Sequence, residues 1–210
     1  MNIFNKKNTF CISVKSNTAR WARMQARFLF LGMRVTRWDA STPDTVTDNF
    51  YDNLSGYQKA CAQSHINVWR HIVDSNLPYA LIMEDDACFD KQWYSKLLEF
   101  NNTDCDLILL NSSEPTTPYR WTKASDQYLT GCYVISNKGA KTIFELFKHQ
   151  YGSADWMTKC LQDCCNSYTY FPWLVVQEGL DTTISSNLDG DREKVVKCLC
   201  EISYSLDNYI

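Results

Sequence analysis

The stretch "PYALIMEDDACFD", residues 78–90, joins an apolar run directly to three acidic side chains. The run from Ala80 to Met83 is typical of a strand that is buried on both faces of a sheet. Glu84, Asp85 and Asp86 follow it without a spacer. Because adjacent carboxylates repel one another and are costly to bury, this stretch predicts a positive partner at the end of the strand.

Strand-like and helix-like segments alternate on both sides of this stretch. Short apolar runs predict strands, and apolar residues at helical spacing predict helices. The expected strands are 9–14, 33–40, 79–83, 106–111, 128–136 and 173–177. The expected helices are 19–31, 57–73, 91–100, one after Ser136, one after Ser153 and a tail after Glu193. This alternation predicts one α/β domain over residues 1–210, a sandwich with a mostly parallel central sheet and loops at 41–56 and 112–127.

The end of the central strand is a predicted ligand site, because ligands of such sheets bind beyond the carboxyl ends of the strands. In an extended segment Glu84 and Asp86 project to the same side, so they are expected to share a site while Asp85 pairs elsewhere. Carboxylates suit Mg²⁺ or Mn²⁺, which also bind substrate phosphates such as those of a nucleotide-diphosphate donor. The alternative is a solvated acidic turn that continues to Asp90.

Composition excludes several classes of function. A net charge of −3 gives no support to a nucleic-acid partner, and no apolar run reaches the length of a membrane helix. The sequence has neither a Gly-x-Gly-x-x-Gly motif nor a phosphate-binding Gly-Lys-Ser/Thr loop, which argues against a dinucleotide fold or a nucleotide triphosphatase. The N-terminal segment is too short and polar for a signal peptide, so we expect a cytoplasmic protein.

The ten cysteines are expected to be reduced thiols in that compartment. Five of them were weighed as zinc ligands: Cys160, Cys164, Cys165, Cys198 and Cys200. Their spacing fits no familiar pair of zinc ligands, so the sequence favours buried or free thiols over a zinc site.

Seven segments, in chain order, resemble motifs of glycosyltransferase family 25, which comprises bacterial lipopolysaccharide galactosyltransferases and animal procollagen galactosyltransferases. They are "SVKSNTARWARMQARFLFLGM", "WDAST", "ACAQSHINVW", "LIMEDDACFD", "TGCYVISNKGAKTIFE", "SADWM" and "LVVQEGLDTTIS". The resemblance covers about residues 9–188 and leaves 189–210 as a C-terminal extension. The chain departs from the family pattern at Tyr57-Gln58, in place of Gly-Glu, and at Glu84, where these folds generally carry Asp. No histidine follows His149, so a late histidine ligand is missing.

The resemblance implies a GT-A type nucleotide-sugar-binding fold and a metal-dependent enzyme using Mn²⁺ or Mg²⁺. It implies inverting transfer of a hexose, galactose or glucose, from a UDP-linked donor to a hydroxyl acceptor on a glycan, lipid-linked sugar or glycoprotein. The alternative is a catalytically inactive nucleotide-sugar-binding or assembly module of the same fold, and a homo-oligomer is compatible with either. A metal-dependent phosphohydrolase fits the acidic cluster but not the other motifs.

The resemblance also assigns roles to single residues. Asp86 is the expected metal ligand, with Glu84 second, and either Asp181 or Asp189 could supply a late acidic ligand. Asp155 is the expected general base, with Glu114 and Glu178 as alternates. The expected donor-binding residues are Arg20, Ser64, His65, Glu84, Asp85, Gly131, Gln177 and Ser185.

Two of these assignments compete with a structural role. His65 lies on an apolar stripe with Cys61 and Trp69, where a histidine is usually a satisfied core residue, but its family context favours a contact near the donor. Trp156, next to Asp155, is assigned to the core, with stacking on a sugar ring as the alternative.

Overall fold

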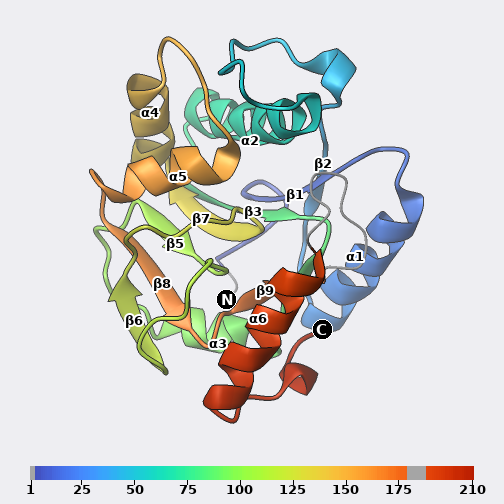
Figure 1. Ribbon diagram of the computed structural model, residues 1–210, viewed down its shortest axis with the longest axis vertical. Coiled ribbons are helices and arrows are strands. Elements are labelled where there is room, and N and C mark those ends of the chain that lie inside the picture. The colour runs from blue at the N-terminus through green and yellow to red at the C-terminus, as the bar shows by residue number, and fades with distance from the viewer. Residues whose placement is uncertain (1–2, 179–187) are drawn as a thin grey trace.

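The computed structural model describes residues 3–178 and 188–210, with the side chains of 188–192 left out (Figure 1). Its strands are β1 (Thr9–Ser13), β2 (Thr36–Asp39), β3 (Tyr79–Glu84), β4 (Ala87–Phe89), β5 (Leu107–Leu109), β6 (Arg120–Lys123), β7 (Cys132–Ser136), β8 (Ser167–Phe171) and β9 (Val175–Gln177). Its helices are α1 (Thr18–Leu31), α2 (Gly56–Asp74), α3 (Trp93–Leu98), α4 (Asn137–Leu146), α5 (Ala154–Gln162) and α6 (Leu188–Glu201), with 3-10 turns η1 (Pro43–Thr45) and η2 (Leu206–Asn208).

Within the described residues, seven strands form the main sheet in the order β2-β1-β3-β7-β5-β8-β6, and β4 pairs with β9 in a small second sheet. Strands β2, β1, β3, β5 and β8 run in one direction, whereas β7 and β6 run against them. The expectation of an α/β fold with a mostly parallel central sheet is therefore confirmed, with two antiparallel strands added.

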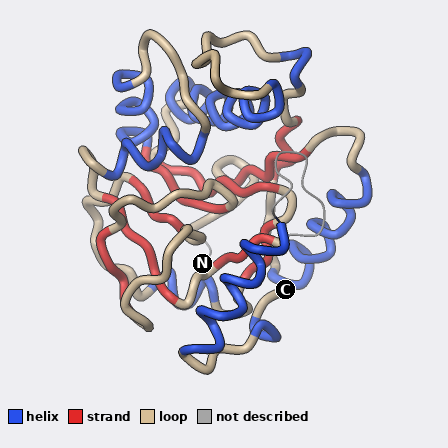
Figure 2. The backbone as a smooth tube through the Cα atoms, viewed as in Figure 1, coloured by secondary structure: helices blue, strands red, loops and turns tan. Residues whose placement is uncertain are grey.

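Helices cover both faces of the sheet, as Figure 2 shows. Ala80 and Ile82 of β3 point into a core with α2, α4 and α5, while Leu81 and Met83 point into a second core with α1 and α3. This alternation of side chains between two buried layers explains why the strand has no polar residue before Glu84.

The carboxyl ends of β1 and β3 lie beside the amino end of β7. Ile12 of β1 lies beside Glu84 of β3 in parallel register, and Met83 lies opposite Cys132, where β7 begins. The backbone N–H of Glu84 donates to the carbonyl of Gly131 at 2.9 Å. The acidic stretch is thus fixed at the carboxyl end of a central strand, as the sequence predicts.

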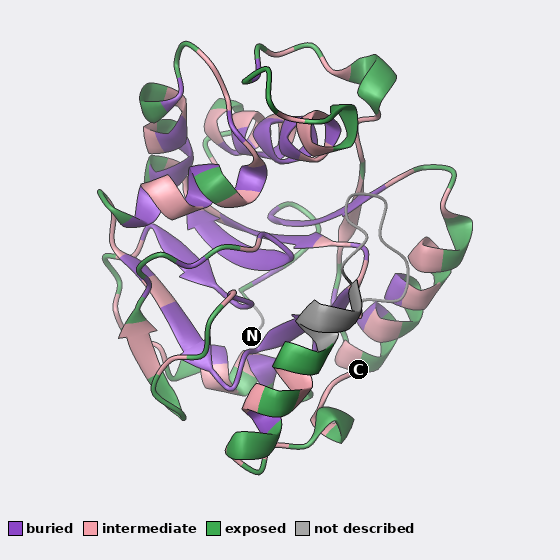
Figure 3. Cartoon of the chain, viewed as in Figure 1, coloured by how far each residue is buried: buried purple, intermediate pink, exposed green. Residues whose placement is uncertain are grey.

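Strand β6 lies inside the segment 112–127 that was expected to be a loop. It pairs with β8 at the edge of the sheet, and its residues are exposed or half-buried (Figure 3). An edge strand needs little apolar sequence, because one side and part of its faces remain in water. For this reason hydrophobic patterning did not reveal it.

The C-terminal segment is anchored to β4. The backbone groups of Phe89 and Ile210 exchange hydrogen bonds of 2.8 and 2.9 Å, and Leu199 of α6 is fully buried. Beneath this contact, the buried carboxylate of Asp90 binds the Lys96 ammonium at 2.7 Å and the hydroxyl of Tyr204. The buried ion pair of Asp90 and Lys96 is therefore hydrogen-bonded to the C-terminal segment through Tyr204.

The ten cysteines lie in the described part of the chain, and none of them forms a disulfide bond there. No helix of the described part of the chain has both the length and the apolar character needed to cross a membrane.

Replacing Lys96 with Met is expected to lower the free energy of unfolding by about 3 kcal/mol, because it leaves a buried carboxylate without its cation. Urea unfolding followed by circular dichroism measures this change. The matched control is Lys194→Met, which breaks an ion pair with Glu114 in which both side chains are exposed, at 43% and 57%. That control should cost less than about 1 kcal/mol, and equal losses in the two variants would contradict the prediction.

Candidate active site

Arg20 is the positive partner of the acidic stretch. The residue lies in the first turn of α1, where its backbone N–H donates to the capping side chain of Asn17 at 3.2 Å. Its Nε atom lies 3.0 Å from Oδ1 of Asp85, and its Nη2 atom lies 2.9 Å from Oδ2 of Asp86. One guanidinium therefore holds two neighbouring carboxylates, a pairing to which its planar fork is suited.

The directions of the three carboxylates differ from the sequence-based expectation. Strand β3 ends at Glu84, and Asp85 and Asp86 form a turn, so the alternation of an extended chain does not continue through them. Asp85 and Asp86 share Arg20, whereas Glu84 contacts the layer of α2. Among the described residues, these three carboxylates do not form a close group of ligand atoms.

Glu84 belongs to a buried hydrogen-bond network. Its Oε1 atom lies 3.2 Å from Nε2 of His65 and accepts from the hydroxyl of Thr130 at 3.3 Å. The other ring nitrogen of His65 lies 2.8 Å from the hydroxyl of Tyr133, which accepts from the indole N–H of Trp69 at 2.8 Å. His65, expected either in the core or near the donor, is fully buried and contacts the site through Glu84.

These contacts determine a preferred tautomer for His65. Because the Tyr133 oxygen accepts from Trp69, its own proton is free to bind Nδ1 of His65. The Nε2 atom then carries the ring proton and donates it to Glu84. This arrangement gives the polar hydrogens of Trp69, Tyr133 and His65 an acceptor each and fixes the direction of the Glu84 carboxylate.

The acidic stretch carries more negative charge than its partners neutralise. Burial raises the pKa of Asp86 to about 6, and the charges of Glu84 and Asp85 add to this effect against the opposing charge of Arg20. Burial likewise raises the pKa of Asp85. For Glu84, hydrogen bonds from His65 and Thr130 overcome the effect of burial and lower the pKa. One guanidinium among three carboxylates leaves a deficit of positive charge.

This deficit, together with hard oxygen ligands, fits a divalent cation such as Mn²⁺ or Mg²⁺. Asp86 would hold it, with Glu84 able to bind through water. One softer set of atoms, from Cys61, His65 and Glu84, lies within 4.8 Å of one another. Burial raises the pKa of the Cys61 thiol, and both nitrogens of His65 already have partners, so we assign this set to the hydrogen-bond network.

Gly131 allows side chains to approach the site closely. A Cβ atom at this position would lie 3.0 Å from Cγ and Cδ of Gln177 and 3.1 Å from Nδ2 of Asn111. The amide of Gln177 lies 3.5 Å from Oδ1 of Asp86. Gly131 was expected to bind the donor, and the space that it provides is taken in this structure by Gln177 next to Asp86.

Ser64 has a structural contact in this structure. Its hydroxyl donates to the carbonyl of Ala60 at 2.8 Å and accepts from the backbone N–H of Ser41 at 2.8 Å. It therefore attaches the segment after β2 to helix α2, and no described contact joins it to the carboxylates.

Arg37 is a residue of this site that sequence analysis missed. From β2 it donates to the hydroxyl of Ser13 at 3.1 Å and to the carbonyl of Val14 at 3.0 Å, and its guanidinium lies 4.7 Å from the ring of Trp21. Ser13 in turn bonds to Asp85. A basic residue near the end of a strand, next to the loop that follows β1, was the available signal.

Asp155 lies at the start of α5, on the same side of the sheet as Glu84. Burial raises the pKa of the Cys61 thiol, and the negative charges of Glu84, Asp155 and Asp86 each add to this effect, so each of the three carboxylates acts on the same cysteine of α2. The Oδ1 atom of Asp155 accepts from the backbone N–H of Trp156 at 2.8 Å. Within the part of the chain that the structure describes, Oδ2 has no hydrogen-bond partner.

The alternates to Asp155 are both engaged in ion pairs. Glu178 binds Arg23 at 3.3 Å and Arg27 at 3.1 Å. Glu114 pairs with Lys194 and is exposed. Both carboxylates are therefore already bound to cationic side chains in this structure.

Trp156 was assigned to the core, and this assignment was wrong. Its side chain packs against Phe147 and Tyr51, but the residue remains 36% exposed. Other expected residues lie outside the described part: Ser185 and Asp181 fall in 179–187, and the side chain of Asp189 is among those left out.

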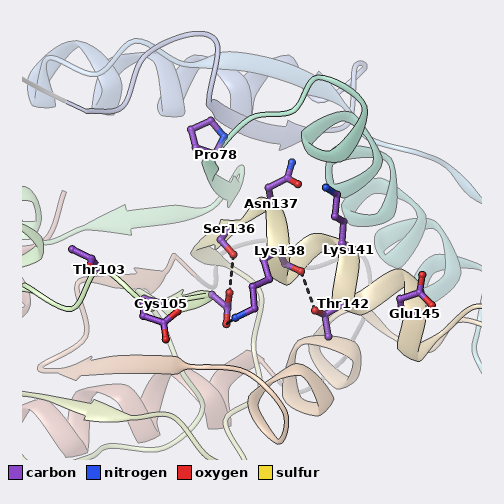
Figure 4. A pocket seen from close by; sticks show the side chains of 11 residues that line it. Pro78, Thr103, Cys105, Ser136, Asn137, Lys138, Lys141, Thr142 and Glu145 are labelled. Atoms are coloured by element: carbon purple, nitrogen blue, oxygen red, sulfur yellow. Dashed lines mark hydrogen bonds and ion pairs between the residues drawn. The ribbon is translucent and has the colours of Figure 1, made fainter.

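A pocket of about 560 Å³ lies at the other end of the strands, near the amino ends of β3 and β5. Figure 4 shows side chains of Ser136, Lys138 and Thr142 from one wall and Thr103 from the other. The buried carboxylate of Asp106 is satisfied there by the hydroxyl of Ser136 and the ammonium of Lys138, each at 3.1 Å. We interpret the Asp106 carboxylate and its two partners as a structural cap at the amino ends of the parallel strands.

The sequence profile of glycosyltransferase family 25 (LPS biosynthesis protein) matches residues 6–158. The lacto-N-neotetraose biosynthesis glycosyltransferase LgtE of Neisseria meningitidis serogroup B is 23% identical over 235 aligned residues, which cover 87% of this chain and 81% of the relative. Procollagen galactosyltransferase 1-A of Xenopus laevis is 33% identical over 105 residues, 43% of this chain but only 17% of the relative's length.

A solved structure of similar fold is a glycosyltransferase involved in the glycosylation of the major capsid of PBCV-1. It matches with a TM-score of 0.50 and 7% identity over 90% of this chain and 98% of that chain. At this identity the likeness concerns the fold alone, and it agrees with a GT-A-like α/β sandwich.

In metal-free protein, Asp86→Asn is expected to increase stability near pH 8. A carboxyl with a raised pKa contributes stability below its unfolded value that is lost as the pH rises from about 4 to about 6. The displacement corresponds to about 3 kcal/mol, part of which the variant gives back by losing the charged contact with Arg20. We expect thermal melts to show a net gain of about 1–2 kcal/mol at about pH 8 that disappears by about pH 5.

The matched control is Asp90→Asn, a second buried aspartate that has a full ammonium partner. This variant should be destabilised at both pH values, because it leaves Lys96 unpaired. A stability loss of similar size for Asp86→Asn at both pH values would contradict the charge deficit.

Proposed function

Because this chain belongs to glycosyltransferase family 25, we propose that it is an inverting hexosyltransferase that moves galactose or glucose from a UDP-linked donor to a hydroxyl group. The observation that carries this proposal is the placement of Glu84–Asp86 at the carboxyl end of β3, with Asp155 in the same neighbourhood. Carboxylates with a charge deficit suit a metal-bound diphosphate, and a separate carboxylate suits proton removal from an acceptor.

The donor half of the site would be formed by β1, β3 and the start of α1. Arg20 and Arg37 order the loop after β1 and the two aspartates. Gln177, held beside Asp86 by the absence of a side chain at Gly131, supplies an amide that can turn toward a donor. These groups would orient the diphosphate so that the anomeric carbon faces Asp155.

A divalent cation on Asp86, with Glu84 through water, would neutralise charge on the departing nucleoside diphosphate. Other residues of this chain orient the carboxylates that would bind the cation. Arg20 takes one oxygen of Asp86, which leaves Oδ1 facing only the long contact with Gln177. The chain from Trp69 through Tyr133 and His65 holds Glu84.

At the acceptor, Asp155 would accept the hydroxyl proton as oxygen attacks the anomeric carbon from the face opposite the leaving group. Its Oδ1 is held by the backbone N–H of Trp156, and Oδ2 is the oxygen left to bind a substrate proton. Asp155 lies in the first turn of α5, at the positive end of the helix dipole.

The function is tested with a panel of UDP, GDP and CMP sugars, assayed for thermal stabilisation and hydrolysis with and without Mn²⁺. A donor at 100 times its dissociation constant should stabilise the protein by about 2.7 kcal/mol. In Asp86→Asn the Mn²⁺-dependent part of this stabilisation should be lost, since the ligand oxygen is replaced. Equal binding of UDP and Mn²⁺ by the variant and the wild type would remove Asp86 from the metal site.

Asp155→Asn is expected to keep donor affinity and to lose transfer. The amide has the shape of the carboxylate but accepts no proton at neutral pH, and loss of a general base costs about 10²–10⁴-fold in rate. Single-turnover transfer to an acceptor sugar measures the change. The control Glu114→Gln alters an exposed carboxylate paired with Lys194 and should retain transfer; loss in the control alone would move the base to Glu114.

A further inference from the structure

We propose that Trp156 and Tyr51 form the acceptor subsite and that the acceptor is a sugar ring rather than a peptide side chain. The proposal rests on the function proposed above, because it uses the proposed base Asp155 to locate the point at which the sugar is transferred. It is carried by an exposed aromatic pair that the fold holds in one orientation and whose Trp156 follows Asp155 in the first turn of α5.

The indole of Trp156 is fixed by its surroundings. Its ring centroid lies 5.7 Å from that of Tyr51 in an edge-on contact and 5.2 Å from that of Phe147. Beneath it lies Gly152, where a Cβ atom would come within 2.2 Å of the indole. A glycine is therefore required for the ring to lie in this position.

Two loops, the one that carries Tyr51 and the one that leads into α5 and Trp156, are joined by hydrogen bonds. The N–H of Tyr51 donates to the carbonyl of Tyr151 at 3.0 Å, and the N–H of Tyr151 donates to the carbonyl of Asn49 at 2.9 Å. The amide of Gln150 donates to the carbonyl of Phe50 at 3.0 Å. The two loops thus form one rigid support for the aromatic rings.

Despite this support, both rings stay in contact with water. Trp156 is 36% exposed and Tyr51 is 38% exposed, although the core beneath them contains Phe147 at 6%. Large aromatic side chains that are held in place and left exposed are typical of binding surfaces, because their area is bound at little entropic cost.

The position of the pair identifies the ligand. The backbone N–H of Trp156 donates to Oδ1 of Asp155 at 2.8 Å, so the proposed base is oriented within the first turn of the helix that also carries the indole. A hexose has an apolar face of C–H groups that packs on the negative face of an aromatic ring, while its hydroxyls project from the edge. A sugar stacked on Trp156 would present an edge hydroxyl to Oδ2 of the adjacent carboxylate.

Kinetics of three variants test the subsite with methyl β-galactoside, methyl β-glucoside and methyl N-acetyl-β-glucosaminide as acceptors. Trp156→Leu keeps apolar volume without a ring and should raise acceptor KM about three- to tenfold, with donor KM altered by less than about twofold. Trp156→Phe restores a ring and should recover most of the loss. Phe30→Leu, which alters an aromatic side chain of α1 that is 61% exposed, is the control and should match wild type.

A second measurement is independent of catalysis. The indole N–H signal of Trp156, assigned by its absence in the spectrum of Trp156→Phe, should shift on titration with at least one of the three glycosides. Transfer by wild type with no shift and an unchanged acceptor KM in Trp156→Leu would overturn the subsite and leave the function standing. Transfer to a hydroxylysine peptide but to no glycoside would also overturn it. A shift without transfer from any donor would overturn the proposed function and retain the sugar-binding surface.

Discussion

The guanidinium of Arg20 holds Asp85 and Asp86 together at the end of β3, and the geometry of the site depends on this contact. It joins the first turn of α1 to the turn that follows the central strand, so the two elements that flank the donor half cannot move independently. The same contact is insufficient by itself, because the pKa of Asp86 stays raised by burial and by its acidic neighbours. An excess of buried negative charge destabilises the folded state. Destabilising features of this kind are typical of functional sites.

Sequence patterning predicted the parts of the fold that bury apolar surface. The run Ala80–Met83 sits in the middle of the sheet, and α1 and α2 begin within a residue or two of their expected positions. Strands β6 and β8 were not predicted, because "RWTK" at an exposed edge and the mixed sequence "SYTYF" lack a clear apolar pattern. The directions of Asp85 and Asp86 were also missed, since they depend on where the strand stops rather than on which residues it contains.

The site shows the same division between what patterns reveal and what they do not. Residues near the acidic stretch or in recognisable motifs, such as Arg20 and Asp155, lie in the expected neighbourhood. The contacts that orient them come from Thr130, Tyr133 and Arg37, which are far away in the sequence and ordinary in type. The two interpretations considered for His65 were not exclusive. The residue is a core histidine whose ring nitrogens both have partners, and its contact with Glu84 orients that carboxylate in the site.

Charge and aromatic surface occupy different parts of this site. The carboxylates of the acidic stretch and Arg20 belong to the end of β3 and the first turn of α1, whereas Tyr51 lies in the loop before α2 and Trp156 in the first turn of α5. A diphosphate binds through charge and a sugar ring through shape and apolar contact, so the two halves suit chemically different ligands. Asp155 precedes Trp156 in α5, and its charge acts on Cys61 of α2 together with those of Glu84 and Asp86. That intermediate position is what a base needs if it is to remove a proton from one ligand while the other departs.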